Sequence, residues 1–462
     1  MLFNSYIFLF VFLPVTYIVF WSLRTRGLRY AWLAFTGYVF YGYWRPAFCL
    51  LMAFSTLVSY TSGLGFLKWG DNPRVRKWLL VAPIVADLAL LGYFKYTGFG
   101  IRIVNALLDL GGKPILPLLD IVLPVGISFY TFHTITYIVD AYRGAIRPTR
   151  NIFEFSCYVS LFSQLVAGPI VRFRELEADL ENIGNKDRRK FLDVGWSFLA
   201  IGMIQKVLIA DTIAAVIDPA LENVSALSTS GAWMCMLGYT YQLYFDFAGY
   251  SNMAVGLGFL FGMRIPQNFD SPYKALNPAD FWRRWHISLS RCLRDYLYIP
   301  LGGNRFGELL TYRNLTITML LGGLWHGAAW TFVAWGAYHG LLLALYRRFS
   351  ARWDAFPAAA QRTAMFLLAL CGWTMFRSAN WGDMRVLFSR LLVPHAGEAV
   401  AGAAMLGVMI AVAAALAHLG PNTFEMSHRW RPLAAASLTA LFLVCLIRIC
   451  GASNSPFLYF QF

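Results

Sequence analysis

The chain has 462 residues, of which 58% are hydrophobic, 17% aromatic and 14% charged. Soluble domains are typically about 45–50% apolar and about 25% charged, so a water-soluble fold of this composition would lack the polar surface to cover itself. The formal net charge of +15 at pH 7 would suit nucleic acid. The basic residues, however, lie in short segments between apolar stretches, which is the positive-inside pattern of membrane proteins. The sequence therefore excludes a soluble globular protein and predicts no nucleic acid partner.

Apolar stretches long enough to cross a bilayer recur along the whole chain. A helix that crosses the hydrocarbon core needs about 20 mostly apolar residues. We expect spans near residues 5–23, 30–43, 49–66, 78–93, 121–139, 194–217, 363–376, 399–418 and 433–447. Further spans in the central region bring the total to about ten to twelve. The sequence thus predicts an all-α, polytopic integral membrane protein with re-entrant and interfacial helices around a central channel. Residues 1–462 should form a single membrane domain with a motif-dense core at 121–345.

The basic loops predict the orientation of the chain. Residues 24–29 and 68–77 are rich in lysine and arginine, and cytoplasmic loops carry an excess of these residues. We therefore expect both loops in the cytoplasm and the N-terminus outside. The apolar segment 153–171 should follow a re-entrant path, because a full crossing would place the highly charged stretch 172–190 outside.

Two long runs in the middle of the chain are almost free of charge. Residues 231–263 contain only Asp246 as a charged residue, and residues 314–346 contain none. Either run would be ~50 Å long as one helix, too long for an upright crossing and short for two. Steep tilt, broken helices or paired short elements are implied. Irregular backbone at membrane depth occurs only where protein or a cavity surrounds it, so these runs should line an internal site.

The connector between the two runs, residues 264–313, is rich in arginine. If the connector were one helix, five residues would form an apolar stripe along one side: Phe281, Trp285, Leu289, Cys292 and Tyr296. Arginines such as Arg283 and Arg284 fall on the other side. His286 lies at the margin of the stripe, so its ring could point inward. The pattern predicts a helix in the membrane interface. Its arginines could bind anionic lipid or the phosphates of a donor substrate, and the residues favour neither.

His326 lies deep in the second run, and an intramembrane ionisable residue is a functional candidate. Gly323 and Gly327 beside it form a G-x-x-x-G pair that allows close backbone approach. This arrangement suits a groove for an acyl chain, and it equally suits tight packing around a structural histidine. His339 repeats the same G-x-x-H-G pattern, and on one continuous helix the two histidines would point about 220° apart. The pair also resembles haem ligands, although a matching second pair is missing. The residues alone do not decide between His326 and His339.

Asp246 is the one carboxylate of the first run, followed closely by Ser251 and Asn252. A lone intramembrane carboxylate normally has a partner or water. Asp246 could orient a catalytic group, relay protons or accept structural hydrogen bonds. No metal-ligand motif is present, so we expect no metal.

Five phrases resemble, in order, motifs of the membrane-bound O-acyltransferase family. They are LPVGISFY at 123–130, QLVAGPI at 164–170, FDFAGYS at 245–251, FWRRWHISL at 281–289 and LWHG at 324–327. The match is closest to the bacterial branch of alginate O-acetyltransferases and teichoic-acid D-alanyltransferases, and it extends over nearly the whole chain.

The resemblance implies an O-acetyltransferase of the bacterial inner membrane. It would use cytoplasmic acetyl-CoA as a substrate, with no bound cofactor, and act in O-acetylation of an exopolysaccharide such as alginate or cellulose. His326 matches the essential histidine of the family, and His286 matches its second catalytic position, whereas His339 matches none. Substrate-binding candidates are Asp246, Ser251, Asn252, Arg283, Arg284 and Trp325.

The partners expected from this interpretation are membrane lipids, a polysaccharide acceptor and a separate extracytoplasmic acetyltransferase. A separate protein is expected because the sequence offers no soluble domain large enough to hold a polymer. Two other classes remain open. One is a transporter or flippase that moves an acylated carrier without chemistry, since midplane polar residues also suit transport. The other is a haem or quinone redox protein.

Overall fold

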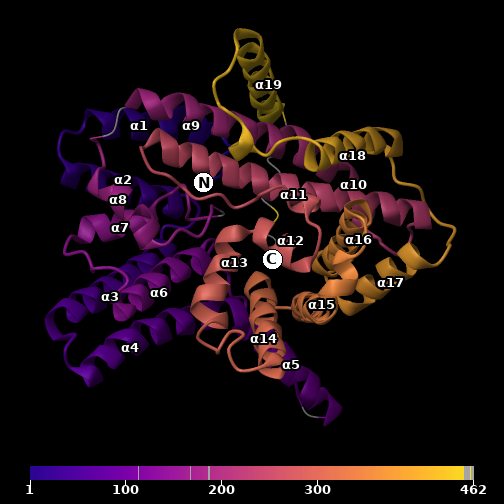
Figure 1. The fold of residues 1–462 in the computed structure, drawn as a ribbon, viewed down its shortest axis with the longest axis horizontal. Helices are drawn as coiled ribbons and strands as arrows, with labels where there is room; N and C mark the ends of the chain where they lie inside the picture. The colour runs from indigo at the N-terminus through magenta and orange to yellow at the C-terminus, as the bar shows by residue number, and fades with distance from the viewer. Residues whose placement is uncertain (113, 167, 186–187, 452–457, 459–462) are drawn as a thin grey trace. The chain divides into compact units, whose positions relative to one another are not determined.

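The computed structural model describes residues 1–112, 114–166, 168–185, 188–451 and 458 (Figure 1). Within these residues the regular structure is helical, and the only β pairing is an isolated bridge between Leu227 and Glu398. The all-α prediction is therefore confirmed. The chain divides into two compact units: unit 1 comprises Met1–Gly195 and Ala254–Pro266, and unit 2 comprises Trp196–Met253 and Gln267–Phe462. The single-domain organisation stays a prediction.

Several helices are long and apolar enough to cross a membrane. In the described part of the chain they are Phe48–Trp69, Pro73–Leu110, Phe191–Glu222 and Pro432–Gly451. Two shorter apolar helices, Ile7–Ser22 and Ala403–His418, coincide with predicted spans. The helical, apolar character of a polytopic membrane protein is thus present. The expected total of about ten to twelve spans and the central channel stay predictions.

Unit 1 is a bundle of membrane helices followed by short ones. Its elements are η1 (Ile7–Phe12), α1 (Leu13–Ser22), α2 (Arg26–Gly42), α3 (Phe48–Trp69), α4 (Pro73–Leu91), η2 (Gly92–Tyr96), α5 (Thr97–Leu110), α6 (Ile127–Arg143), α7 (Ile152–Ser160) and α8 (Phe173–Glu181). Helix α3 packs on α4 and α6, and α2 packs on α7. The span predicted at 121–139 begins only at Ile127, because Gly126 in the left-handed region (φ 79°) starts the helix there.

The segment predicted to be re-entrant contains only one short helix. Helix α7 has nine residues, and at 1.5 Å per residue it is roughly 14 Å long, too short to cross a bilayer. After it, the described residues from Leu161 to Arg172 are not helical. This geometry suits a path that turns back.

Unit 2 holds the second half of the chain. Its elements are η3 (Ile204–Ala210), α10 (Asp211–Glu222), η4 (Pro272–Lys274), α12 (Pro278–Arg284), α13 (Ile287–Leu293), η5 (Arg294–Tyr298), α14 (Glu308–His326), α15 (Trp330–Asp354), α16 (Ala358–Arg377), α17 (Trp381–Leu392), α18 (Ala403–His418), η6 (Thr423–Glu425) and α19 (Pro432–Gly451). Two helices, α9 (Arg188–Met203) and α11 (Thr229–Leu260), belong partly to each unit.

The two uncharged runs take different forms. The first is one unbroken helix, α11, of 32 residues, which is ~48 Å long and needs tilt to fit a bilayer. The second is broken after His326 into α14 and α15, which pack on each other. Broken and paired helices were among the predicted solutions for such runs.

Glycines bring α14 and α15 close together. A Cβ added to Gly323 would collide with the carbonyl oxygen of Phe332, and one added to Gly336 would collide with that of Met319. The predicted role of Gly323 in close backbone approach is confirmed, although its partner is the next helix in the chain.

We predict that Gly336→Ala destabilises the protein by about 1–3 kcal/mol, because a methyl group there overpacks two backbones. Gly407→Ala in α18 is the matched control, since no described atom lies within 4 Å of the added Cβ, and alanine favours a helix. Thermal unfolding of both variants in detergent gives the comparison. Equal unfolding temperatures would show that the α14–α15 contact tolerates a side chain.

A buried ion-pair cluster anchors α11 within unit 2. Lys206 of η3 pairs with Asp246 of α11 and also with Asp211, at 2.8 Å from its Oδ1. The side chains of Lys206 and Asp246 are 2% and 1% exposed. The backbone amide of Leu458 donates to the second carboxylate oxygen of Asp246 at 3.1 Å. Asp246 therefore has the partner that an intramembrane carboxylate requires.

Lys206→Met should destabilise the protein by about 3–5 kcal/mol, because it leaves buried Asp246 and partly exposed Asp211 without their cation. Asp246→Asn should be milder, since Lys206 keeps Asp211 as a partner. The folded fraction and unfolding temperature of each purified variant test this order. The reverse order of stability would contradict a shared lysine.

Candidate functional site

The connector contains a sharp break at His286, so the prediction of one continuous helix is wrong, whereas its location in the membrane interface stays a prediction. Helix α12 starts where the side chain of Asn277 accepts a hydrogen bond from the amide of Asp280 (2.8 Å) and ends at Arg284. His286 has φ 43° and ψ 55°, in the left-handed region, and α13 begins at the next residue. A residue other than glycine in this conformation costs on the order of 1–2 kcal/mol, so the surroundings must hold it there.

The segment 268–270 supplies the hydrogen bonds that the break removes. The amide of Ile287 donates to the carbonyl of Asn268, and the amide of Asp270 donates to the carbonyl of Arg284, both at 2.9 Å. Helix termini leave backbone groups without partners, and buried ones must be satisfied elsewhere. This neighbouring segment is the physical reason why the helix stops here.

The break turns the His286 side chain fully inward. His286 has no exposed surface, so the inward orientation expected for a residue at the margin of the apolar stripe is confirmed. Its ring lies against Phe247 at 4.7 Å and Trp325 at 6.0 Å between centroids. Its Nδ1 is 3.1 Å from Oδ1 of Asn268. Burial lowers the pKa of the imidazole, so the ring is neutral at pH 7. The stripe itself is buried at Phe281, Trp285, Leu289 and Cys292.

His326 is the last residue of α14, at the turn into α15. Its ring contacts Trp325 at 4.9 Å, Trp335 at 5.1 Å and Phe376 at 5.3 Å. Trp325 therefore touches both His286 and His326, which are 40 positions apart in the sequence (326 − 286). The structure thus brings both predicted catalytic residues, and the predicted binding residue Trp325, into one aromatic cluster.

His339 belongs to the same cluster but is engaged differently. Its Nδ1 accepts a hydrogen bond from Nε1 of Trp282 at 3.3 Å, and its ring stacks on Phe281. Because α14 and α15 are separate helices, the angle derived for a continuous helix does not apply. Trp335 contacts both His326 and His339. The contacts of His339 are those of a packed core residue.

The candidates on α11 have different surroundings. Ser251 accepts a hydrogen bond from Nδ2 of Asn268 at 3.2 Å and so belongs to the surroundings of His286. Asn252 donates to Gln205 at 2.7 Å and to Thr423 at 2.9 Å. Together with the ion pair of Asp246, the contacts of Asn252 favour a role in joining helices.

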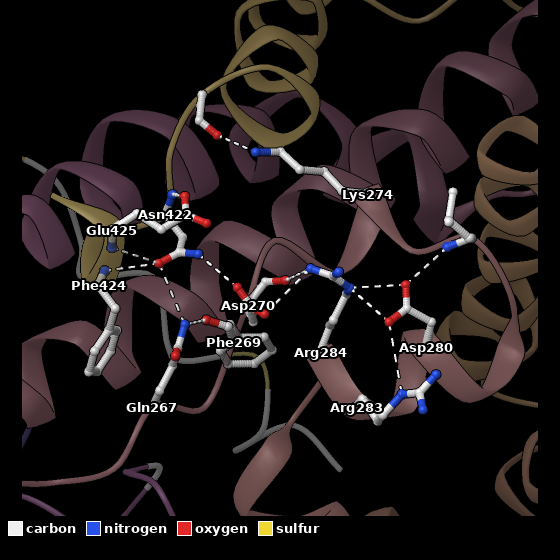
Figure 2. A network of polar contacts seen from close by, with 12 residues as sticks. Gln267, Phe269, Asp270, Lys274, Asp280, Arg283, Arg284, Asn422, Phe424 and Glu425 are labelled. Carbon is white, nitrogen blue, oxygen red and sulfur yellow. Dashed lines mark hydrogen bonds and ion pairs between the residues drawn. The ribbon is translucent and has the colours of Figure 1, made fainter. Parts of the chain in front are cut away.

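The two arginines of α12 also differ. Arg284 donates from Nε to both oxygens of Asp280 at 3.1 Å and from its guanidinium to Asp270. Figure 2 shows this network continuing from Asp270 to Asn422, which donates to it at 2.9 Å. The side chain of Arg283 is 71% exposed and lies 3.9 Å from Asp280. Arg283 is therefore the arginine available to a ligand or lipid.

Sequence reasoning missed Asn268 and Lys206. Asn268 is 18 positions from His286, and no spacing rule connects them. Lys206 is a single lysine within the predicted span 194–217, and this signal could have identified the partner of Asp246.

Two hollows lie in unit 1. Their volumes are about 280 and 370 Å³, and both are lined by Arg147 and Pro148. They contain none of the predicted site residues.

Comparisons with known proteins agree on one family. Residues 119–381 match the model of MBOAT, the membrane-bound O-acyltransferase family. The chain is 40% identical over 495 aligned residues to a probable alginate O-acetylase AlgI of Pseudomonas putida, with 100% of both chains covered. It is 44% identical to the protein of that name in Pseudomonas aeruginosa, over 84% of this chain and 75% of the relative. It is 36% identical to a peptidoglycan O-acetyltransferase of Helicobacter pylori, over 82% of this chain and 77% of the relative. The chain therefore belongs to the membrane-bound O-acyltransferase family and is an acyltransferase.

Proposed function

We propose that this protein is a membrane O-acetyltransferase of the bacterial inner membrane. It takes the acetyl group of cytoplasmic acetyl-CoA and passes it across the membrane, where an extracytoplasmic acetyltransferase completes the O-acetylation of an exopolysaccharide. The names of the relatives support this proposal, since they describe O-acetylation of alginate and of peptidoglycan. Alginate, cellulose and similar polymers are the acceptors to test.

The observation that carries the proposal is the pair of buried histidines that share Trp325. A hydroxyl that attacks a thioester is a weak nucleophile at neutral pH and needs a positioned base. A neutral imidazole can supply that base. The sequence predicts His326 as the base and His286 as the group that orients it or the donor.

Arg283 is the proposed contact for the phosphates of acetyl-CoA, because its guanidinium is exposed whereas that of Arg284 is held by carboxylates. Anionic lipid is the alternative partner of the same side chain.

The competing function is transport of an acylated carrier without chemistry. Purified protein with acetyl-CoA and a soluble hydroxyl acceptor separates the two functions, because only a transferase releases the CoA thiol as the acetyl ester forms. A carrier that moves without thiol release would favour the transporter.

We predict that His326→Ala and His286→Ala each lower the transfer rate by ~10²–10⁴, the usual effect of losing a general base or its support. His339→Ala should reduce the yield of folded protein, because it opens a cavity in the aromatic cluster, and should retain transfer per folded molecule. For all three variants, the rate of CoA thiol release is measured and divided by the amount of monodisperse protein, which gives the transfer rate per folded molecule.

The fourth variant, His339→Gln, keeps an acceptor for the indole of Trp282. It should restore the yield of folded protein at an unchanged rate. An active His326→Ala beside an inactive His339→Ala would reverse the assignment of the two histidines.

The donor side of the membrane can be tested through the loops of unit 1. If α2 and α3 cross the membrane, the loop at 24–29 and Arg74 lie on one side and Arg45 lies on the other. In a cysteine-free background, Arg74→Cys should resist a membrane-impermeant maleimide in intact cells and react after permeabilisation. Arg45→Cys is the control that should react at once. Both native side chains are exposed. Ready labelling at position 74 in intact cells would invert the orientation.

A further inference from the structure

The loop between α18 and α19 is fastened to the connector at two points. Nζ of Lys274 donates to the carbonyl of Gly420 at 2.7 Å. Nδ2 of Asn422 donates to Oδ1 of Asp270 at 2.9 Å (Figure 2). The two contacts join residues that are 146 and 152 positions apart in the sequence. All four residues belong to unit 2.

The turn around Asn422 fixes the direction in which its side chain donates. Its Oδ1 accepts hydrogen bonds from the backbone amides of Phe424 at 3.0 Å and Glu425 at 3.2 Å. A backbone N–H can only donate, so the oxygen faces these amides and the NH₂ group faces Asp270. The side chain of Glu425 accepts from the amide of Asn422 at 2.8 Å, which completes a capping box. The turn that Asn422 caps therefore holds its NH₂ group against Asp270.

Asp270 connects this turn to the end of α12. Its Oδ2 and its backbone carbonyl accept from the guanidinium of Arg284 at 3.4 and 3.2 Å. Its amide donates to the carbonyl of Arg284 at 2.9 Å. Three polar atoms of Asp270 thus contact Arg284, and the fourth, Oδ1, contacts Asn422. A displacement of Asn422 is transmitted to Arg284 through this one residue.

The two non-glycine residues of the connector with positive φ lie beside this contact. Ser271 has φ 44° and follows Asp270 directly, and His286 has φ 43° and lies two residues after Arg284. Residues with a side chain avoid the left-handed region, so neighbouring contacts must hold both residues there. The hydrogen bonds between Asp270 and Arg284 join the two stretches of chain that contain them. A shift of Asp270 would therefore reach the backbone that turns the His286 ring inward.

The network is suited to orienting the connector more than to stabilising the fold. The side chains of Arg284 and Asp270 are 31% and 39% exposed, and ion pairs that water reaches contribute little to stability. His286, in contrast, is fully buried. Loss of the contact at Asp270 should therefore displace the His286 ring and leave most of the protein folded.

We propose that Asn422 is a positioning residue and that the α18–α19 loop, through Asp270 and Arg284, sets the place of the His286 ring. This inference rests on the proposed acetyl transfer, in which His326 is the base and His286 orients the base or the donor. A misplacement of about 1 Å can lower a rate by ~10². A contact that touches neither histidine can therefore control kcat.

The first test is Asn422→Asp. Aspartate keeps the oxygen that caps the turn and places a second carboxylate against Asp270, so repulsion should break the contact. We expect kcat per folded molecule to fall by ~10–10². Adding Asp270→Asn restores a donor that faces the new carboxylate, and the remaining amide oxygen still accepts from Arg284. The double variant should recover most of the rate, and one as slow as Asn422→Asp would overturn the proposal.

Thr423→Val is the matched control. Thr423 is the next residue of the same loop, and its hydroxyl accepts from Asn252 at 2.9 Å. The substitution removes one hydrogen bond of the loop at nearly unchanged volume. It should lower the folded yield and leave kcat per folded molecule unchanged. If Thr423→Val lowered kcat as much as Asn422→Asp, the loop would have a structural role only and the proposal would fail.

The second test asks whether Asn422 acts through His286. In a His286→Ala background, Asn422→Asp should cause no further loss of kcat, because the ring that it positions is absent. The same fold loss in both backgrounds would show that Asn422 acts elsewhere and would contradict the inference.

The third test needs no activity. Ring ¹⁵N and ¹³C shifts of histidine-labelled protein, with the His286 signals assigned from His286→Gln, should change in Asn422→Asp. They should return in the double variant and stay unchanged in Thr423→Val. Unchanged His286 signals in Asn422→Asp would overturn the inference. Signals that move as expected in a protein that releases no CoA thiol would instead refute the proposed acetyl transfer and leave the positioning contact established.

Discussion

Polar groups buried among apolar helices must find their partners inside the chain, and this constraint explains the local structure of unit 2. An uncompensated polar group costs several kcal/mol where no water can reach it. Lys206 accordingly forms ion pairs with both Asp211 and Asp246. The backbone amide of Leu458 donates a hydrogen bond to the second carboxylate oxygen of Asp246. The same rule applies at the break in the connector, where backbone groups of segment 268–270 replace the helical partners that α12 and α13 lose.

The two breaks determine where the rings of His286 and His326 lie. His286 lies between two short helices, and His326 ends the helix before a turn. On a continuous amphipathic helix, the His286 ring would have remained at the edge of the apolar face. The left-handed backbone at His286 instead points the ring into the aromatic cluster. At the second break, the contact of Gly327 with the ring of Phe332 lets α15 fold back closely on α14. The irregular backbone at His286 and His326 thus determines where their rings lie.

The sequence predicts best what depends on length and apolarity alone. The span expected at 49–66 is Phe48–Trp69 in the structure, and the paired helices of the second long run were among the expected solutions. The prediction of one continuous helix in the connector failed because a periodicity of 100° per residue describes only an isolated helix. Segment 268–270, which satisfies the backbone groups at the break, lies earlier in the same connector, at a separation that helical periodicity does not describe. The lysine of the Asp246 ion pair and the amide beside His286 were missed for the same reason, since both partners come from other elements.

Motifs named two of the relevant histidines, but their chemistry depends on single neighbouring atoms. At His286 an oxygen that can only accept draws the proton to Nδ1, and at His339 an indole that can only donate leaves it on Nε2. At His428 the carbonyl of Thr423 lies 2.8 Å from Nε2 and draws the proton there, so Nδ1 accepts from the hydroxyl of Ser197. Aromatic contact, which all three share, therefore does not identify a base. Nε2 lacks a hydrogen-bond partner in the described residues at both His286 and His339, and by these contacts it is unprotonated at His286 and protonated at His339. The chemistry of the hydrogen-bond partner, rather than the motif, thus decides which nitrogen of each ring carries the proton.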